Sequence, residues 1–450
     1  MTIAHTLAEF ATNAPPLSDA ARSAAVRATF DLVSCALAGR ETSGGRAALR
    51  AAPRVWGAGP AACWFSDLRL TAPGAAFVNA AFACMLDLDD GHRAASGHPG
   101  APVIPAVLAT AETTGADAER VLAAIAIGYE VGVRIAGARD VEMLHTFDSG
   151  LWCGQGVAAA VSWLRGLDAE KMAHAIAIAG TTATGQTATA FTKHMGNNVK
   201  EGIPFATAQG LVAVELAAAG FTGPVDLLDD PARYDPAVLL GGLGGAWLIE
   251  TGYFKLYGCC RWAHAAIDAI LDLMASKRLT VDAIEAIHVE TFSQTMLLNN
   301  ELAPPTLEGA QYSVPFCIAA AAVHGADALL PLTESMLKDP AVLAMSPRVT
   351  LSVAPDLDAM FPRGVPARVT AKTKTGTHTV TVLAPRGEPA NPLSDEDLQA
   401  KFFSIADGQI TPAATADLLA AFAAFRSGTL APLLTALGRS SALVETAAAV

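Results

Sequence analysis

The stretch VLAAIAIGYEVGVRIAGA, residues 121–138, shows the pattern that dominates this chain. Alanine, the residue with the lowest intrinsic cost in a helix, supplies many of its apolar positions. Residues 155–180 and 203–219 are similarly alanine-rich and apolar on nearly every side, which predicts long helices buried on most of their surface. The sequence therefore predicts a mainly helical fold.

The chain also carries signals of a second, smaller unit. Helix boundaries are clearest at residues 17–39, where Ser18 is the predicted N-cap and Gly39 the predicted C-cap. After about residue 280, the segments IEAIHVETF, RVTLSVAP, ARVTAKTKT and HTVTVLAP alternate in the way typical of strands, and residues 374–377 lie at an expected hairpin turn. Since 450 residues exceed one ordinary core, we expect a discontinuous all-helical domain, residues 1–262 and 390–450, with an α+β lid domain, residues 263–389, inserted before the C-terminal helices.

Composition excludes several classes of partner. The net charge is −13, the pI is near 5.2 and no run is strongly basic, so we expect no nucleic acid partner. We expect no secretory signal, because no charged segment followed by an apolar one opens the chain, and no membrane span, because the longest uncharged apolar stretch, PAVLLGGLGGAWLI, is too short and too rich in glycine. Seven cysteines without zinc spacing fit reduced thiols. The sequence predicts a soluble, cytoplasmic protein.

Titratable residues concentrate in LDLDDGHRAASGHPGAPVIP, residues 86–105. Glycines and prolines predict a loop of fixed shape, and catalytic groups often lie on such loops. The alternatives are an aspartate cap with surface histidines, or a calcium loop, although the spaced oxygen ligands of an EF-hand are missing. We therefore predict no metal site, and we expect acid/base or substrate-binding groups among the titratable residues Asp87, Asp89, Asp90, His92 and His98.

A second cluster, FKLYGCCRWAH, combines two cations with a tyrosine and a histidine: Lys255, Arg261, Tyr257 and His264. A helix beginning near Cys260 would place Arg261 and His264 on one face, and its N-terminal end would favour a bound carboxylate. Arg261 as an ordinary surface residue is the alternative.

Two further segments precede predicted helices. FTKHMGNNVKEG supplies Lys193 and Lys200, which either bind an anion or simply cap the following helix. HTFDSGLWCGQG places Ser149 and Trp152 at a helix start, where its glycines would otherwise serve only close helix packing. No GxGxxG, GxSxG or HExxH motif accompanies them.

Four segments, in this order, resemble the MmgE/PrpD family, which includes 2-methylcitrate dehydratase, cis-aconitate decarboxylase and iminodisuccinate epimerase. They are LDLDDGHRAASGHPGAPVIPA, KHMGNNVKEG, FKLYGCCRWAHAAIDA and PRGEPANPLSDEDLQAKF. The resemblance extends from about residue 5 to beyond residue 400. It implies a large helical domain with a smaller α+β lid, a homodimer, and no metal or organic cofactor.

The resemblance also implies roles for individual residues. Asp87 and His98 match the family's catalytic aspartate and histidine, and Lys255 and His264 match the pair in its Lys-x-x-Pro-x-Cys-x-x-x-His segment. Lys193 matches its other substrate-binding lysine.

The sequence departs from the family pattern at three points. Gly258 replaces the usual proline, and the segment after Lys193 is two residues shorter, so Lys193 and Lys200 compete for one role. Trp152 stands where many members have a histidine, which puts the family's usual substrates in doubt.

We therefore expect a cofactor-independent lyase of the 2-methylcitrate dehydratase type, which transfers a proton next to a carboxylate of a small di- or tricarboxylic acid. Cations would grip the carboxylates and stabilise the carbanion. His98 would be the acid/base, oriented by Asp87, with His264 or Tyr257 on the opposite face. Dehydration is the expected reaction. Epimerisation, decarboxylation and, in another class, non-catalytic binding of small anions are the alternatives.

Overall fold

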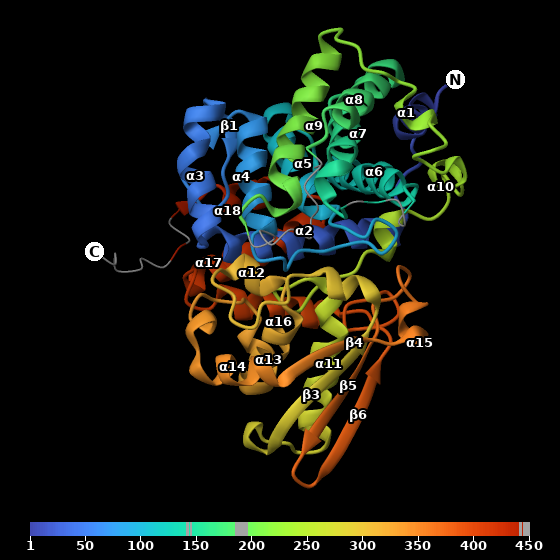
Figure 1. Cartoon of the computed structure of the whole chain (residues 1–450). Coiled ribbons are helices and arrows are strands. Elements are labelled where there is room, and N and C mark those ends of the chain that lie inside the picture. Colours follow the sequence, from blue (N-terminus) through green and yellow to red (C-terminus); the bar gives the residue numbers. More distant parts are fainter. Residues whose placement is uncertain (141–143, 145, 185–196, 441–442, 444–450) are drawn as a thin grey trace.

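The computed structural model describes residues 1–140, 144, 146–184, 197–440 and 443. Helices dominate, which confirms the predicted mainly α class. Most of the N-terminal helices form the upper part of Figure 1, with α2 crossing the middle of the molecule. Their bounds are α1 (Ile3–Thr12), α2 (Asp19–Arg40), α3 (Ser43–Trp56), α4 (Ala72–Cys84), α5 (Gly100–Thr114), α6 (Ala118–Gly137), α7 (Cys153–Leu164), α8 (Ala169–Thr181), α9 (Ile203–Ala218) and α10 (Pro236–Leu240). The sequence analysis missed a short antiparallel ribbon of β1 (Ala58–Ala62) and β2 (Arg69–Leu70).

The helix boundaries agree in part with the predicted ones. Ser18 caps α2 by accepting a hydrogen bond from the backbone of Ala21, as predicted. Gly39 is not a C-cap but lies inside α2, and its lack of a side chain has another reason: a Cβ there would come within 1.8 Å of the carbonyl oxygen of Phe82 on α4. The single helix predicted for residues 155–180 is two helices, α7 and α8, separated at Gly166, whose φ is +72°.

The predicted strands are present and form one sheet in the lower part of Figure 1. Its order is β4 (Val349–Val353), β3 (Ile284–Thr291), β5 (Ala367–Thr373) and β6 (Gly376–Val382), with β3 and β4 parallel and the other pairs antiparallel. Thr373 pairs with Gly376, which confirms the hairpin turn. The remaining helices of this part are α11 (His264–Ser276), α12 (Leu307–Gln311), α13 (Val314–His324), α14 (Pro340–Met345) and α15 (Pro355–Asp358).

The C-terminal helices return to the first part of the chain. They are α16 (Asp395–Ala406), α17 (Pro412–Arg426) and α18 (Ala431–Leu437), and both α16 and α17 pack against α2. The core is apolar and rich in alanine, and it extends through both parts of the molecule. No helix in the described ranges is long and apolar enough to cross a membrane.

Candidate active site

The acidic loop lies between α4 and α5. Helix α4 ends at Cys84 and α5 begins at Gly100, so the polar residues occupy a non-helical segment, as predicted. Gly91 pairs with Tyr253, and a Cβ at Gly91 would lie 2.3 Å from the tyrosine side chain, so only glycine permits this approach. Asp87 adopts a left-handed φ of +51°, which is uncommon outside glycine and is a form of strain often found at functional sites.

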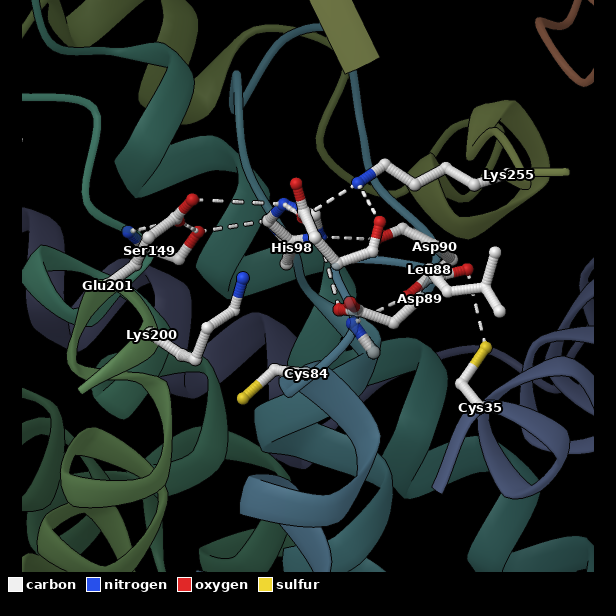
Figure 2. A network of polar contacts seen from close by, with 12 residues as sticks. Cys35, Cys84, Leu88, Asp89, Asp90, His98, Ser149, Lys200, Glu201 and Lys255 are labelled. Carbon is white, nitrogen blue, oxygen red and sulfur yellow. Dashed lines mark hydrogen bonds and ion pairs between the residues drawn. The ribbon is translucent and has the colours of Figure 1, made fainter. Parts of the chain in front are cut away.

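His98, near the end of this loop, lies between Asp87 and Asp89, and Figure 2 shows it beside Asp89 and Glu201. Its Nδ1 donates to the carbonyl oxygen of Asp90 at 2.9 Å and lies 3.1 Å from Asp89 Oδ2. Since a carbonyl only accepts, Nδ1 carries a hydrogen, and Nε2 is the nitrogen directed toward Asp87 Oδ1, at 3.5 Å. Burial disfavours the imidazolium, but the carboxylates of Asp89 and, to a smaller extent, Glu201 favour it, and the net effect raises the pKa of His98 to about 9.

Asp87 is paired with a completely buried lysine. Lys255 Nζ donates to Asp87 Oδ1 at 2.8 Å and to the Asp87 carbonyl oxygen at 2.7 Å. Burial alone would raise the pKa of Asp87, but Lys255, followed by Lys200 and His98, lowers it to about 2. The Asp87 carboxylate raises the pKa of Lys255 against the opposing effect of burial. Asp87 is therefore a fixed anion and a weak base.

The second lysine of the site is Lys200. Its Nζ donates to Gln311 Oε1 at 2.7 Å and lies 5.2 Å from the centre of the Tyr312 ring. Within the described residues it forms no ion pair with a carboxylate, so its charge is available to an anion. Lys193, its competitor in the sequence, lies outside the described residues.

Glu201 is a site residue that the sequence analysis missed. Its Oε1 lies 4.0 Å from His98 Nε2, and its Oε2 accepts a 2.8 Å hydrogen bond from Ser149 Oγ. Ser149 Oγ also accepts from the backbone N–H of His98 at 3.1 Å. Lys200 and Glu201 are consecutive left-handed residues, with φ of +47° and +57°. No sequence pattern predicts this backbone turn, which directs both side chains to the site.

Asp87, Asp89 and His98 are also close enough to hold a metal ion, with possible ligand atoms within 4.8 Å of one another. However, Asp87 faces one ring nitrogen of His98 and Asp89 faces the other, so the imidazole lies between the carboxylates. The Lys255 ammonium already neutralises Asp87. We therefore assign these residues to charge balance and proton transfer.

Asp90 and His92 shape the loop. Asp90 accepts from the Tyr129 hydroxyl at 2.6 Å and from the Gly100 N–H at the start of α5, and burial raises its pKa to about 7. His92 Nε2 donates to the Leu248 carbonyl oxygen at 3.1 Å, and burial lowers the pKa of His92 to about 4. Neither side chain is directed at the Nε2 side of His98 by these contacts.

The polar residues that follow Lys255 bind other groups of the protein, whereas the sequence predicted that they bind the substrate. Arg261 Nη1 donates to His264 Nδ1 at 3.0 Å, which agrees with the predicted placement of both residues on one face. Arg261 also binds Glu388 Oε1 at 2.9 Å and backbone carbonyls of residues 385 and 386, so its guanidinium is occupied by the protein itself.

His264 and Tyr257 are likewise engaged. His264 Nε2 donates to the Cys259 carbonyl oxygen, and burial together with Arg261 lowers the pKa of His264 well below its usual range. The Tyr257 hydroxyl donates to Asp268 at 2.7 Å. These contacts give Arg261, His264 and Tyr257 a supporting place beside the site.

Trp152 packs against the acidic loop at Gly97. The residue is buried at the start of α7, and a Cβ on Gly97 would meet its ring at 3.1 Å and Ser149 Oγ at 2.6 Å.

Gln311 and Tyr312, which were not predicted from the sequence, reach the site from α12 and the residue after it. Only the three-dimensional structure identifies these two residues, because it places them beside Lys200.

Comparison with known proteins places the chain among related sequences. Residues 3–242 match the sequence model of the MmgE/PrpD N-terminal domain, and residues 257–424 match that of the MmgE/PrpD C-terminal domain. Among curated relatives, a cis-aconitate decarboxylase-like protein of Aspergillus oryzae is 26% identical over 75% of this chain and 76% of its own length. The cis-aconitate decarboxylase of Homo sapiens is 28% identical over 75% of this chain and 73% of its own. That of Aspergillus terreus is 28% identical over 63% and 64%.

Proposed function

The chain belongs to the MmgE/PrpD family, and from this premise we propose that it is a lyase acting on a small di- or tricarboxylic acid. The observation that carries the proposal is the setting of His98. A histidine with a pKa of about 9 is an imidazolium at neutral pH, and its Nε2 faces Glu201 and the lysine-bound Asp87. Such a group can give a proton to a substrate but cannot take one.

Cations near His98 support an anionic substrate. Lys200 is close enough to lower the pKa of Asp87, and its own hydrogen-bond partner is the neutral Gln311. A substrate carboxylate that binds Lys200 would bring its neighbouring carbon toward the acidic loop. There, Lys200 would stabilise the negative charge that develops when a bond at that carbon breaks.

Dehydration is the reaction that uses both groups of the site. The Glu201 carboxylate takes the proton from the carbon next to a substrate carboxylate, and the C–O bond on the adjacent carbon breaks. His98 gives its Nε2 proton to the departing hydroxide, so water and a C=C bond are formed. Because this reaction needs a base and an acid, the 4.0 Å approach of Glu201 and His98 supports it.

Decarboxylation is the second candidate, and it is favoured by the similarity of the chain to cis-aconitate decarboxylases. In this case the C–C bond to a carboxylate breaks, CO₂ leaves, and the carbanion takes the proton of His98. Only the acid, His98, is then needed, and Glu201 would take no part in the reaction.

Proton NMR in D₂O with 2-methylcitrate, citrate, cis-aconitate and malate tests the proposal. Loss of water or of CO₂ from one compound, abolished in His98→Ala, is the expected result. Proton exchange with inversion and no elimination would instead indicate an epimerase, and binding without any exchange would indicate a non-catalytic anion binder. The homodimer and the cytoplasmic location stay predictions, the first of which sedimentation can check.

A further inference from the structure

A buried ion pair lies behind the catalytic loop and joins it to the C-terminal part of the chain. Lys401, on α16, is almost completely inaccessible to solvent, and its Nζ donates to Asp31 Oδ1 on α2 at 2.7 Å. The same Nζ donates to the carbonyl oxygen of Leu88 at 2.9 Å. Lys401 belongs to PRGEPANPLSDEDLQAKF, the family-like segment to which the proposed reaction assigns no role.

Stability alone does not explain why the Lys401–Asp31 ion pair is present in the core. Removing two charges from water costs several kcal/mol per ion, and an apolar pair of similar volume is often as stable as a buried ion pair. The contact that an apolar pair could not replace is the hydrogen bond from Lys401 to Leu88.

Leu88 is the residue between the two aspartates that flank His98. Its carbonyl oxygen also accepts a contact from Cys35 Sγ at 3.3 Å, so two side chains from different helices hold one carbonyl (the Cys35 contact is drawn in Figure 2). Asp87, directly before Leu88, has the strained φ of +51°. Such a conformation persists only where its surroundings enforce it.

Asp89, directly after Leu88, depends on its backbone for its position. Its carboxylate lies 3.1 Å from His98 Nδ1, but within the described residues neither oxygen accepts a well-aligned hydrogen bond. A shift of the main chain at Leu88 would therefore move Asp89 away from His98 without resistance from other bonds.

We propose that Lys401 and Asp31 are positioning residues that anchor the main chain at Leu88 and so keep Asp87 and Asp89 on either side of the His98 ring. The proposal rests on the proposed function for its effect on catalysis, but not for its effect on His98 itself. It assigns the C-terminal segment to the active site through a contact that spans more than 300 residues.

The double variant Asp31→Leu/Lys401→Met separates positioning from stability, because it replaces the ion pair by apolar side chains and removes the bond to Leu88. We expect its Tm to stay near that of the wild type, kcat to fall about 10- to 100-fold and KM to change little, since small misplacements of catalytic groups cost rates of this order. Asp31→Asn keeps an acceptor for Lys401 and the bond from Lys401 to Leu88, so the folded variant should retain kcat within about threefold, although it loses stability because Lys401 loses its ion pair. Should the double variant not fold, Asp31→Asn/Lys401→Met keeps a polar side chain on α2, removes the donor to Leu88 and carries the same test.

A matched buried pair provides the control. Glu130 and Arg134 form a 2.8 Å ion pair on α6 whose contacts reach α10 and Leu248 and not residues 86–90. Glu130→Leu/Arg134→Met should leave kcat unchanged. An equal loss of kcat in this control, or in Asp31→Asn, would mean that the loss does not come from the anchor at Leu88, and it would overturn the proposal.

NMR titration of His98 gives a readout that needs no substrate. In the folded double variant we expect a lower pKa of His98, because Asp89 no longer holds its place beside Nδ1. A double variant with the wild-type kcat and the wild-type pKa of His98 would refute the positioning role. If the wild type converts no compound, the proposed function fails, whereas the titration still decides whether Lys401 and Asp31 position the loop.

Discussion

Replacing Asp89 by asparagine should change the pH range in which the protein is active. The Asp89 carboxylate lies 3.1 Å from His98 Nδ1 and is the main cause of the raised pKa of His98. Asparagine has nearly the same shape and no charge. Burial and the Lys255 ammonium, which both lower the pKa of His98, then remain.

The expected size follows from the geometry. A pKa of about 9 instead of the usual 6.5 corresponds to about 3.4 kcal/mol in favour of the imidazolium. Two unit charges 3.1 Å apart attract by about 5 kcal/mol at an effective dielectric constant of about 20, so the Asp89 charge is large enough to be the main influence that raises the pKa of His98 against burial and Lys255. Without it, the pKa of His98 should fall to about 6.5 or below.

The assay is kcat as a function of pH. A general acid works only while it is protonated, so the wild type should keep its activity up to about pH 9 and lose it above. Asp89→Asn should lose activity above about pH 6.5, which amounts to about 30-fold at pH 8 and little at pH 5.5. Asp268→Asn, which changes a carboxylate bound to Tyr257, is the control. An alkaline limb that stays near pH 9 in Asp89→Asn would refute our account of His98.

Four other predictions follow from the same contacts. Lys255→Met leaves Asp87 buried without its ion pair and should lower stability by about 3–5 kcal/mol, measured by urea unfolding, and an unchanged midpoint would contradict this. Because the pKa of Asp87 falls to about 2 on folding, its contribution of about 2 kcal/mol is present above pH 4 and is lost as the pH falls toward 2; Asp87→Asn should weaken this acid sensitivity. Glu201→Gln should lower kcat by about 10²- to 10⁴-fold if the reaction is dehydration, whereas unchanged kcat with release of CO₂ would favour decarboxylation. Dialysis against a chelator should leave activity intact, and activity restored only by added metal would show that Asp87, Asp89 and His98 bind an ion.

The sequence alone determined the class of fold and the position of the acidic loop. Alanine-rich apolar runs and period-two strands are local patterns, and local patterns decide whether a segment becomes helix or strand. Helix α4 ends at Cys84 and α5 begins at Gly100, so Asp87 and His98 lie in the non-helical segment that the sequence predicted around the glycines. A helix boundary was mispredicted: Gly39 is required by the close approach of α4 and does not end α2, and no neighbouring residue in the sequence reveals this contact.

The tertiary structure decided which side chains form the site. The left-handed turn at residues 200–201 directs Lys200 and Glu201 toward His98. Gln311, more than 100 residues later in the chain, accepts the hydrogen bond of Lys200. Arg261, which the sequence offered as a substrate ligand, is instead bound by Glu388. The charge of Asp87 and the engagement of Arg261 thus depend on partners more than 100 residues away, because the state of a buried group is set by the groups around it in space, wherever they lie along the chain.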